Sequence, residues 1–150
     1  MRESKTEMTV LVTPEMSNFG GKMHGGELLK LLDQVAYTCA MRYCGNYVVT
    51  LSVDNVLFKQ SISIGEMVTC KAAINYTGRT SMEVGIQVIA ENLSAGTVRH
   101  TNSSYFTMVS VDVDGKPVPV KPYRPDNELD QRRWLDAEKR KEYRQKMSAT

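Results

Sequence analysis

Asp33 is a candidate reacting group, because a carboxylate can act as a general base or as a nucleophile. It lies on a predicted helix at the edge of the apolar arc, beside Leu29 and Ala36. An ionised carboxylate next to a reactive carbonyl can take a proton from water as a general base, or attack the carbonyl itself and form an anhydride. A solvated carboxylate on the flank of the helix would have the same spacing, and from the spacing alone it is the simpler interpretation.

A glycine-rich loop leads into the same helix and ends in Gly25 and Gly26. The first N–H groups of a helix have no intrahelical partner and lie at the positive end of its dipole. Donors of this kind stabilise the negative charge that develops on a carbonyl oxygen as water adds. The two glycines are therefore candidates for an oxyanion site, although they would also allow the helix and a sheet to pack closely.

Two other residues of this loop are ambiguous on their own. Asn18, taken alone, is typical of a turn. His24 lies near Asp33 in sequence and suggests a catalytic pair, but the chain lacks the Gly-x-Ser-x-Gly motif of a serine triad. We therefore expect His24 to make a structural hydrogen bond or to line the pocket.

A turn between two predicted strands forms a second candidate site, which consists of Gly78, Arg79, Thr80 and Ser81. Backbone N–H groups, two hydroxyls and a guanidinium are suited to binding a phosphate group. An exposed hairpin turn could have the same composition. Lys121, Arg124 and the basic residues near the carboxyl terminus could add contacts, although a helix of mixed charge is more often solvated.

The apolar pattern predicts one long helix among several strands. Apolar residues recur every three to four positions over residues 27–43, which is typical of a helix with a buried face. A charged stretch predicts a second helix over residues 127–147. Strands are predicted over residues 8–13, 47–58, 67–76, 82–91 and 98–111. This order favours the α+β class, with the helix packed on one face of an antiparallel sheet.

Composition excludes several functional classes. The 150 residues, 41% apolar and 24% charged, are typical of one globular domain. A net charge of +2 lacks the basic excess of most nucleic-acid-binding proteins. We expect neither a signal peptide nor membrane insertion, because no apolar run is long enough. Cys39, Cys44 and Cys70 fit neither a disulfide framework nor a zinc site, so we expect reduced thiols in the cytoplasm and no metal.

Several motifs together resemble the acyl-coenzyme A thioesterases of the hot-dog fold. Residues 24–33 (HGGELLKLLD) resemble the helix-entry motif of that family. Three later segments resemble further signatures of the family, namely residues 63–66 (SIGE), 76–84 (YTGRTSMEV) and 101–102 (TN). The likeness is closest to the brain-type acyl-CoA hydrolases and their single-domain bacterial relatives, and it covers roughly residues 10–122.

This resemblance implies a fold and an arrangement of domains. The expected fold is a hot-dog, in which an antiparallel sheet wraps around a long central helix, with an additional C-terminal helix. The hot-dog domain would span residues 1–125, and residues 126–150 would form a charged helical extension.

The resemblance also implies which residues act. In the family an Asn in the loop and an Asp on the helix carry hydrolysis across a dimer interface, and by motif position these fall on Asn18 and Asp33. Asp33 would be the base or the nucleophile, while Asn18 of the partner subunit positions water or donates to the oxyanion. The chain would form at least a homodimer, and relatives commonly assemble as trimers of dimers, which gives a homohexamer. Acyl-CoA would be the substrate, and no cofactor would be needed.

Two alternatives differ in chemistry from this hydrolase. A non-catalytic acyl-CoA-binding hot-dog would keep the phosphate-binding turn but could lose Asp33. A hot-dog dehydratase acting on hydroxyacyl thioesters typically needs a His in a Gly-His-Phe-Pro type of loop, which is not found in this sequence. The presence of both Asn18 and Asp33 favours the hydrolase.

Overall fold

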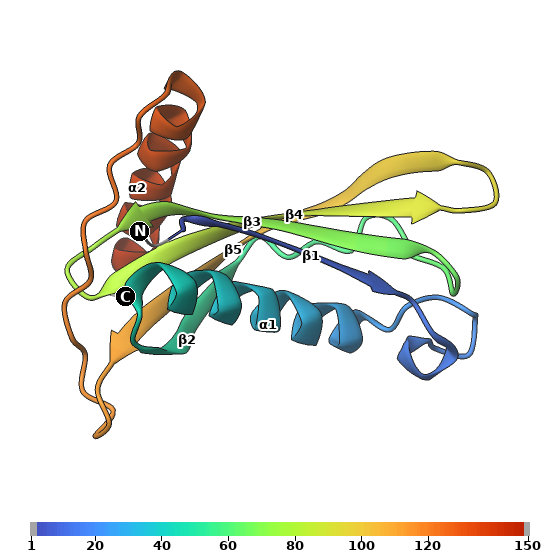
Figure 1. Ribbon diagram of the computed structural model, residues 1–150, viewed down its shortest axis with the longest axis horizontal. Helices are drawn as coiled ribbons and strands as arrows, with labels where there is room; N and C mark the ends of the chain where they lie inside the picture. Colours follow the sequence, from blue (N-terminus) through green and yellow to red (C-terminus); the bar gives the residue numbers. More distant parts are fainter. Residues whose placement is uncertain (1–2, 149–150) are drawn as a thin grey trace.

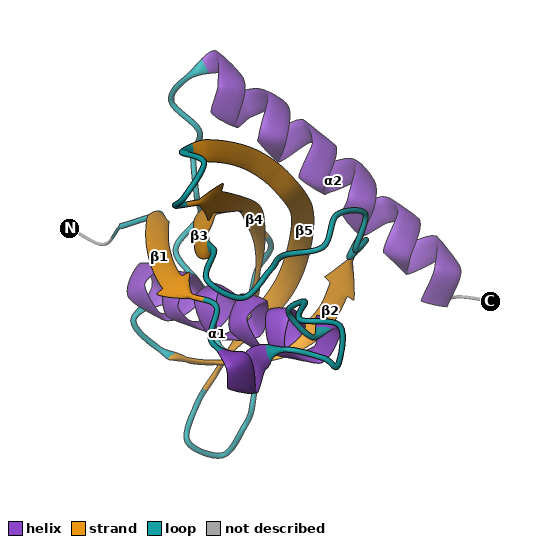
Figure 2. Ribbon diagram, turned by 90° about the vertical axis from the view of Figure 1, so that its right-hand side faces the viewer, coloured by secondary structure: helices purple, strands orange, loops and turns teal. Residues whose placement is uncertain are grey.

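Five antiparallel strands curve around one long helix in the computed structural model, which describes residues 3–148 (Figure 1). The strands are β1 (Lys5–Leu11), β2 (Tyr47–Asp54), β3 (Met67–Thr77), β4 (Ser81–Asn92) and β5 (Thr97–Val111). Their order in the sheet is β1-β3-β4-β5-β2. The helix α1 (Gly25–Cys44) lies along the inner face, and α2 (Glu128–Ser148) crosses the outer face (Figure 2). The expected α+β hot-dog architecture is confirmed.

The helix α1 forms because its apolar residues lie on one face and both of its ends are capped. Leu32, Val35 and Ala36 are fully buried against the sheet. The Nδ1 atom of His24 accepts a hydrogen bond from the Gly26 N–H at 3.0 Å, which starts the helix two residues earlier than the apolar pattern predicted. Gly45 ends it in the left-handed conformation that glycine adopts without strain.

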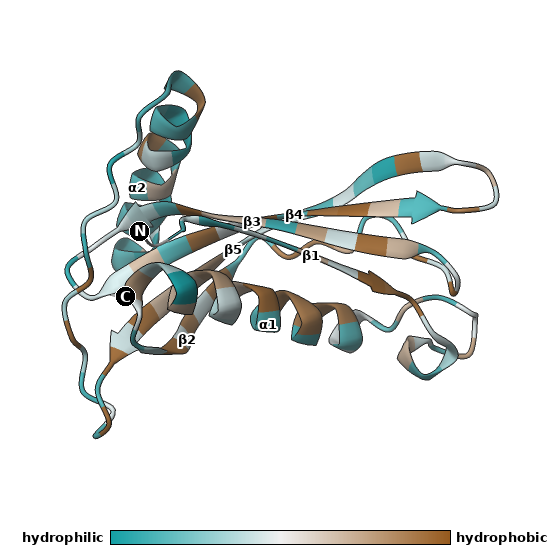
Figure 3. Ribbon diagram, in the orientation of Figure 1, coloured by the Kyte–Doolittle hydropathy of each residue, from teal (hydrophilic) through white to brown (hydrophobic). Residues whose placement is uncertain are grey.

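The sheet has an apolar inner face and a polar outer face. In β4, Met82, Val84 and Ile86 lie buried toward α1, while the intervening Glu83 and Gln87 belong to the opposite face. Hydropathy colouring shows the same contrast, with apolar positions on the side of α1 that faces the sheet (Figure 3). The surface beside α1 is therefore separated from the outer surface by the sheet itself.

Two predicted strands have wrong boundaries. The strand predicted over residues 8–13 runs from Lys5 to Leu11, because the chain leaves the sheet before η1 (Pro14–Met16), a short 3-10 helix. The strand predicted over residues 47–58 ends at Asp54, because Asn55 has a φ of 60° and turns the chain away. The remaining strands and both helices begin and end within two residues of their predicted positions.

The helix α2 is attached to the outer face by aromatic and ionic contacts. Trp134 packs on Tyr76 with a distance of 4.7 Å between ring centroids, and Arg140 pairs with Glu83. The helix expected over residues 127–147 is therefore present, whereas the proposed division of the chain at residue 125 stays a prediction. Within residues 3–148, neither helix is long and apolar enough to cross a membrane.

Candidate active site

Asp33 lies half-buried at the open edge between α1 and β2. Its Oδ1 atom accepts a hydrogen bond of 2.6 Å from the Thr50 hydroxyl. Over residues 3–148, no Lys, Arg or His side chain forms an ion pair with Asp33. The carboxyl group is thus oriented by a neutral donor and has no ionic partner in this part of the chain.

Thr50 is a candidate site residue that the sequence analysis missed. It lies on the edge strand β2, immediately before a shift in the register with β5 between Thr50 and Ser52. Irregularities of this kind re-aim side chains on an edge strand. A threonine in a β-strand is ordinary, so nothing in the sequence distinguished Thr50 from Thr69 or Thr107.

The loop before α1 fixes the orientation of the Asn18 side chain. Its Oδ1 accepts hydrogen bonds from the backbone N–H groups of Gly20, at 2.9 Å, and Lys22, at 3.2 Å. Because both partners are donors, the oxygen must occupy this side of the amide, and the Nδ2 group points the other way. No acceptor within the described residues is bonded to Nδ2, so Asn18 has a free donor at the surface.

The two candidate oxyanion glycines differ in the structure. The N–H of Gly26 is bonded to His24 Nδ1, whereas the N–H of Gly25 has no partner within residues 3–148. Phe58 covers Gly25, since a Cβ placed on this glycine would lie 3.6 Å from the ring. Gly25 is consequently the better candidate donor, and His24 makes the structural hydrogen bond that was expected of it.

The structure does not bring Asn18 and Asp33 together within one chain. Asp33 is eight residues beyond Gly25, which corresponds to about 12 Å along the helix axis. Asn18 is engaged in its own loop beyond the helix start, where its backbone N–H donates to the Lys22 carbonyl. Asp33 and Thr50 therefore form one half of a site, and the loop with Asn18 forms the other.

The 78–81 turn lies at the far end of the molecule from the loop before α1 (Figure 1). Its carbonyl groups are held by β5 and by the chain that follows it, because Thr80 O accepts from Ser110 N and Arg79 O accepts from Val120 N, each at 2.9 Å. The N–H groups of Arg79 and Thr80 have no such partners among the described residues. The turn is a rigid set of donors that is well separated from the helix start of its own chain.

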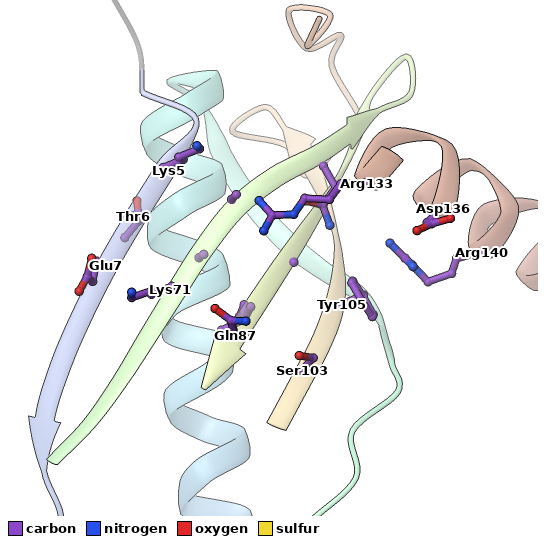
Figure 4. A pocket seen from close by; sticks show the side chains of 15 residues that line it. Lys5, Thr6, Glu7, Lys71, Gln87, Ser103, Tyr105, Arg133, Asp136 and Arg140 are labelled. Atoms are coloured by element: carbon purple, nitrogen blue, oxygen red, sulfur yellow. The ribbon is translucent and has the colours of Figure 1, made fainter. Parts of the chain in front are cut away.

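A hollow of about 510 Å³ is open on the outer face, beside α2 (Figure 4). Lys5, Lys71, Gln87, Tyr105, Arg133 and Arg140 are among the residues that line it. It lies across the sheet from α1, and neither Asp33 nor Asn18 lines it. The hollow is thus not part of the candidate catalytic site.

The cysteines do not contribute nucleophiles to the site. Burial raises the pKa of Cys39 to about 12 and that of Cys70 to about 12, so both remain neutral thiols at neutral pH. No group of three or more potential metal ligands occurs among the described residues.

Comparison with known proteins identifies the family. The model of the thioesterase superfamily matches residues 20–97. The chain belongs to this superfamily. Protein VdlD of Helicobacter pylori is 52% identical over 141 residues, which cover 94% of this chain and 80% of that protein. The expected family and the expected class of enzyme, a thioester hydrolase, are confirmed.

Two solved structures have the same fold as this chain over nearly its whole length. A crystal structure of an apo-hexameric acyl-CoA thioesterase has a TM-score of 0.92 and 40% identity, and covers 97% of this chain and 93% of that chain. The acyl-CoA hydrolase of Staphylococcus aureus, solved with butyryl coenzyme A and coenzyme A, has a TM-score of 0.90 and 31% identity and covers 98% and 90% of the two chains. Variants of the Staphylococcus aureus hydrolase, in which an aspartate, an asparagine or a threonine is replaced by alanine, have also been solved.

Proposed function

We propose that this thioesterase hydrolyses acyl-coenzyme A to a free acid and coenzyme A, with Asp33 as the reacting group. The observation that carries the proposal is the oriented, uncompensated carboxylate of Asp33 beside Thr50 at an open edge. As a base, Asp33 takes a proton from water, which attacks the thioester carbonyl. The C–S bond then breaks, and coenzyme A leaves as a thiolate that takes up a proton. As a nucleophile, Asp33 would form an anhydride that water then hydrolyses.

The variants made in the Staphylococcus aureus hydrolase support the choice of residues. The substituted asparagine and aspartate of that enzyme are 15 positions apart, and its aspartate and threonine are 17 positions apart. Asn18, Asp33 and Thr50 have the same two separations. The three residue types and both separations agree, so we assign the same trio to this site.

We further propose that each site is shared by two subunits. Within one chain Asn18 and Asp33 lie apart, and β2 exposes Tyr47, Val49 and Leu51 at the edge of the sheet. An exposed apolar edge strand is usually covered. A two-fold pairing along β2 would cover this edge and place the Asn18 loop of one chain near Asp33 of the other. The Asn18 Nδ2 group and the Gly25 N–H would then stabilise the oxyanion. Three such dimers would form the expected homohexamer.

The 78–81 turn would bind a phosphate of coenzyme A. Within one chain it lies at the opposite end of α1 from Gly25, so the same two-fold pairing would bring it to the helix start of the partner. Coenzyme A is part of the substrate and is itself a product, and we propose no cofactor or metal. A cytoplasmic location also stays a prediction.

Release of coenzyme A, measured with a thiol reagent over a series of acyl lengths, tests the proposed function. We expect release from acyl-CoA by the wild-type protein, and the series would also define the chain-length preference. Binding of acyl-CoA without release would identify a binding module instead. Formation of an enoyl thioester from a hydroxyacyl thioester would identify a dehydratase.

Subunit mixing tests the shared site. Asn18→Ala and Asp33→Ala subunits are separately inactive in this proposal, but a mixed dimer contains one intact site out of two. We therefore expect activity to return after the two variants are dissociated and reassembled together. Reassembled mixtures that stay inactive would show that the pair acts within one chain.

A further inference from the structure

Lys141 of α2 lies directly against the 78–81 turn. A Cβ atom placed on Gly78 would lie 2.8 Å from Lys141 Nζ and 2.7 Å from Ser81 Oγ. The ammonium group and the hydroxyl therefore converge on the side of Gly78 where any other residue would carry a side chain. Gly78 does not have a positive φ, so a glycine is not required here by the backbone conformation. What distinguishes it is the missing side chain, which leaves room for the ammonium and hydroxyl groups.

The ammonium group of Lys141 is positioned but not neutralised. Its Nζ lies 5.3 Å from the centre of the Tyr76 ring, within the range of a cation–π contact. In the part of the chain that the structure describes, no carboxylate forms an ion pair with it. Arg140, the preceding residue on the same helix, is by contrast bonded to Glu83.

The donors around this point form a cradle for an anion. The Lys141 ammonium and the Ser81 hydroxyl converge at this point, and the same turn carries the Arg79 side chain and the unpartnered backbone N–H groups of Arg79 and Thr80. The turn is rigid, because its carbonyls are bonded to Val120 and Ser110. An ammonium and a hydroxyl that converge on a fixed turn with free backbone N–H groups are characteristic of phosphate sites.

We infer that Lys141 is a phosphate ligand for the nucleotide half of coenzyme A, and that α2 thereby contributes to substrate recognition. The inference rests on the proposed acyl-CoA hydrolase function and extends it to a residue of the C-terminal helix. A contact to the phosphate is present in the bound substrate and in the transition state alike. It therefore lowers KM without raising kcat.

Lys141→Met tests the inference, because methionine keeps an unbranched apolar side chain that can still pack on Tyr76. Lys139→Met is the matched control, since Lys139 is exposed and lies two residues before Lys141, on a different side of the same helix. The substrates are an acyl-CoA, its 3′-dephospho form and the corresponding acyl-pantetheine. We expect Lys141→Met to raise KM for acyl-CoA about tenfold with kcat nearly unchanged, and to leave acyl-pantetheine unaffected.

The comparison of substrates also locates the contact. If the 3′-dephospho substrate is as insensitive as acyl-pantetheine, Lys141 binds the 3′-phosphate, and if it is as sensitive as acyl-CoA, Lys141 binds the diphosphate. The effect on acyl-CoA should diminish at high ionic strength. A second variant, Gly78→Ala, keeps the charge of Lys141 but displaces its ammonium and the Ser81 hydroxyl, and it should raise KM in the same substrate-selective way.

Two results would overturn the inference. One is an equal change in KM for all three substrates, which would indicate a purely structural role. The other is a Lys141→Met protein with the same KM values as Lys139→Met. If the wild-type protein hydrolyses none of the substrates, the proposed function fails separately. Calorimetric titration with coenzyme A and pantetheine would then still decide whether Lys141 binds the nucleotide half.

Discussion

Asp33 and Glu83 are carboxylates on opposite sides of the same sheet, and their surroundings differ in kind. Asp33 is half-buried and has one neutral hydroxyl as its partner. Glu83 is only 3% exposed and accepts two hydrogen bonds of 2.8 Å from Arg140 and one of 3.1 Å from Asn75. A buried charge must be compensated, whereas a reacting carboxylate must remain available. The contrast therefore separates a structural acid from a candidate catalytic one.

The regions around the two carboxylates differ in the same way. The edge formed by α1 and β2 exposes apolar side chains and a carboxylate that has no ionic partner among the described residues. Under α2 the chain compensates the buried charge of Glu83 with its own residues. The Arg140 guanidinium lies 3.6 Å from the centre of the Tyr105 ring, and the missing side chain of Gly85 makes room for Asn75. The contacts around Glu83 hold α2 on the sheet, whereas the edge beside Asp33 is open within a single chain.

The largest effect on stability is expected at Glu83. Glu83→Ala leaves the Arg140 guanidinium without its carboxylate next to a buried Asn75, and breaking a buried ion pair typically costs about 3–5 kcal/mol. Urea unfolding at a fixed protein concentration should show this loss, with kcat of the folded protein nearly unchanged. The control is Glu91→Ala on the same strand, where the side chain is exposed. A loss at Glu83 no larger than that at Glu91 would remove the distinction between the two carboxylates.

For Asp33 we expect a large effect on kcat and a small effect on stability. Asp33→Asn keeps the shape of the side chain but removes its basicity and its charge, so kcat should fall at least ~10²-fold. The free energy of unfolding should change by less than about 1 kcal/mol, because the group has no buried ionic partner. Steady-state hydrolysis and urea unfolding of the same preparation measure both quantities. Glu27→Gln, a substitution of the same kind on the same helix, should retain activity, and near wild-type turnover in Asp33→Asn would refute the catalytic assignment.

A third carboxylate, Glu66, is expected to behave like Glu83 as a structural acid. The free energy of unfolding should therefore depend on pH through Glu66. Hydrogen bonds from Arg99 hold the pKa of Glu66 below its usual value. Because the folded pKa is the lower one, the pair stabilises the fold above the pKa of the unfolded chain, and this contribution disappears as the pH falls through the folded pKa.

Wild type should therefore lose more of its free energy of unfolding than Glu66→Gln as the pH falls from about 6 through the folded pKa of Glu66, because glutamine does not titrate. Urea unfolding at several pH values measures the difference, and parallel losses in the two proteins would contradict it.

Most of the fold could be predicted because its signals are local. The 3–4 spacing of the apolar residues in α1 and the turn residues between strands follow from one segment at a time. The early ends of β1 and β2 depended instead on single backbone conformations, such as that of Asn55. The motifs also predicted Asn18 and Asp33 through a resemblance, and their roles stay predictions.

The rest of the site could not be predicted, because it depends on contacts between distant segments. Thr50 is 17 positions from Asp33, and only the register of β2 with β5 aims its hydroxyl at the carboxylate. Lys141 is more than 60 positions from Gly78. Such pairs leave no periodic pattern in a single sequence, and they become apparent only when the chain is folded.

The smallest effect should come from Thr50, because its hydroxyl acts on the orientation of Asp33. Thr50→Val keeps the volume of the side chain and its preference for a strand but removes the 2.6 Å hydrogen bond to Oδ1. One net hydrogen bond to a charged group is worth about 1.5 kcal/mol, which corresponds to a loss of roughly tenfold in kcat. Thr50→Ser restores the hydroxyl and should restore most of the activity, although the missing methyl group allows it more rotamers. In an Asp33→Asn background the Thr50→Val substitution should have no further effect on kcat, because the two groups act as one unit. Additive losses in the double variant would show that Thr50 contacts the substrate independently of Asp33. The open edge would then contribute two groups to the reaction instead of one.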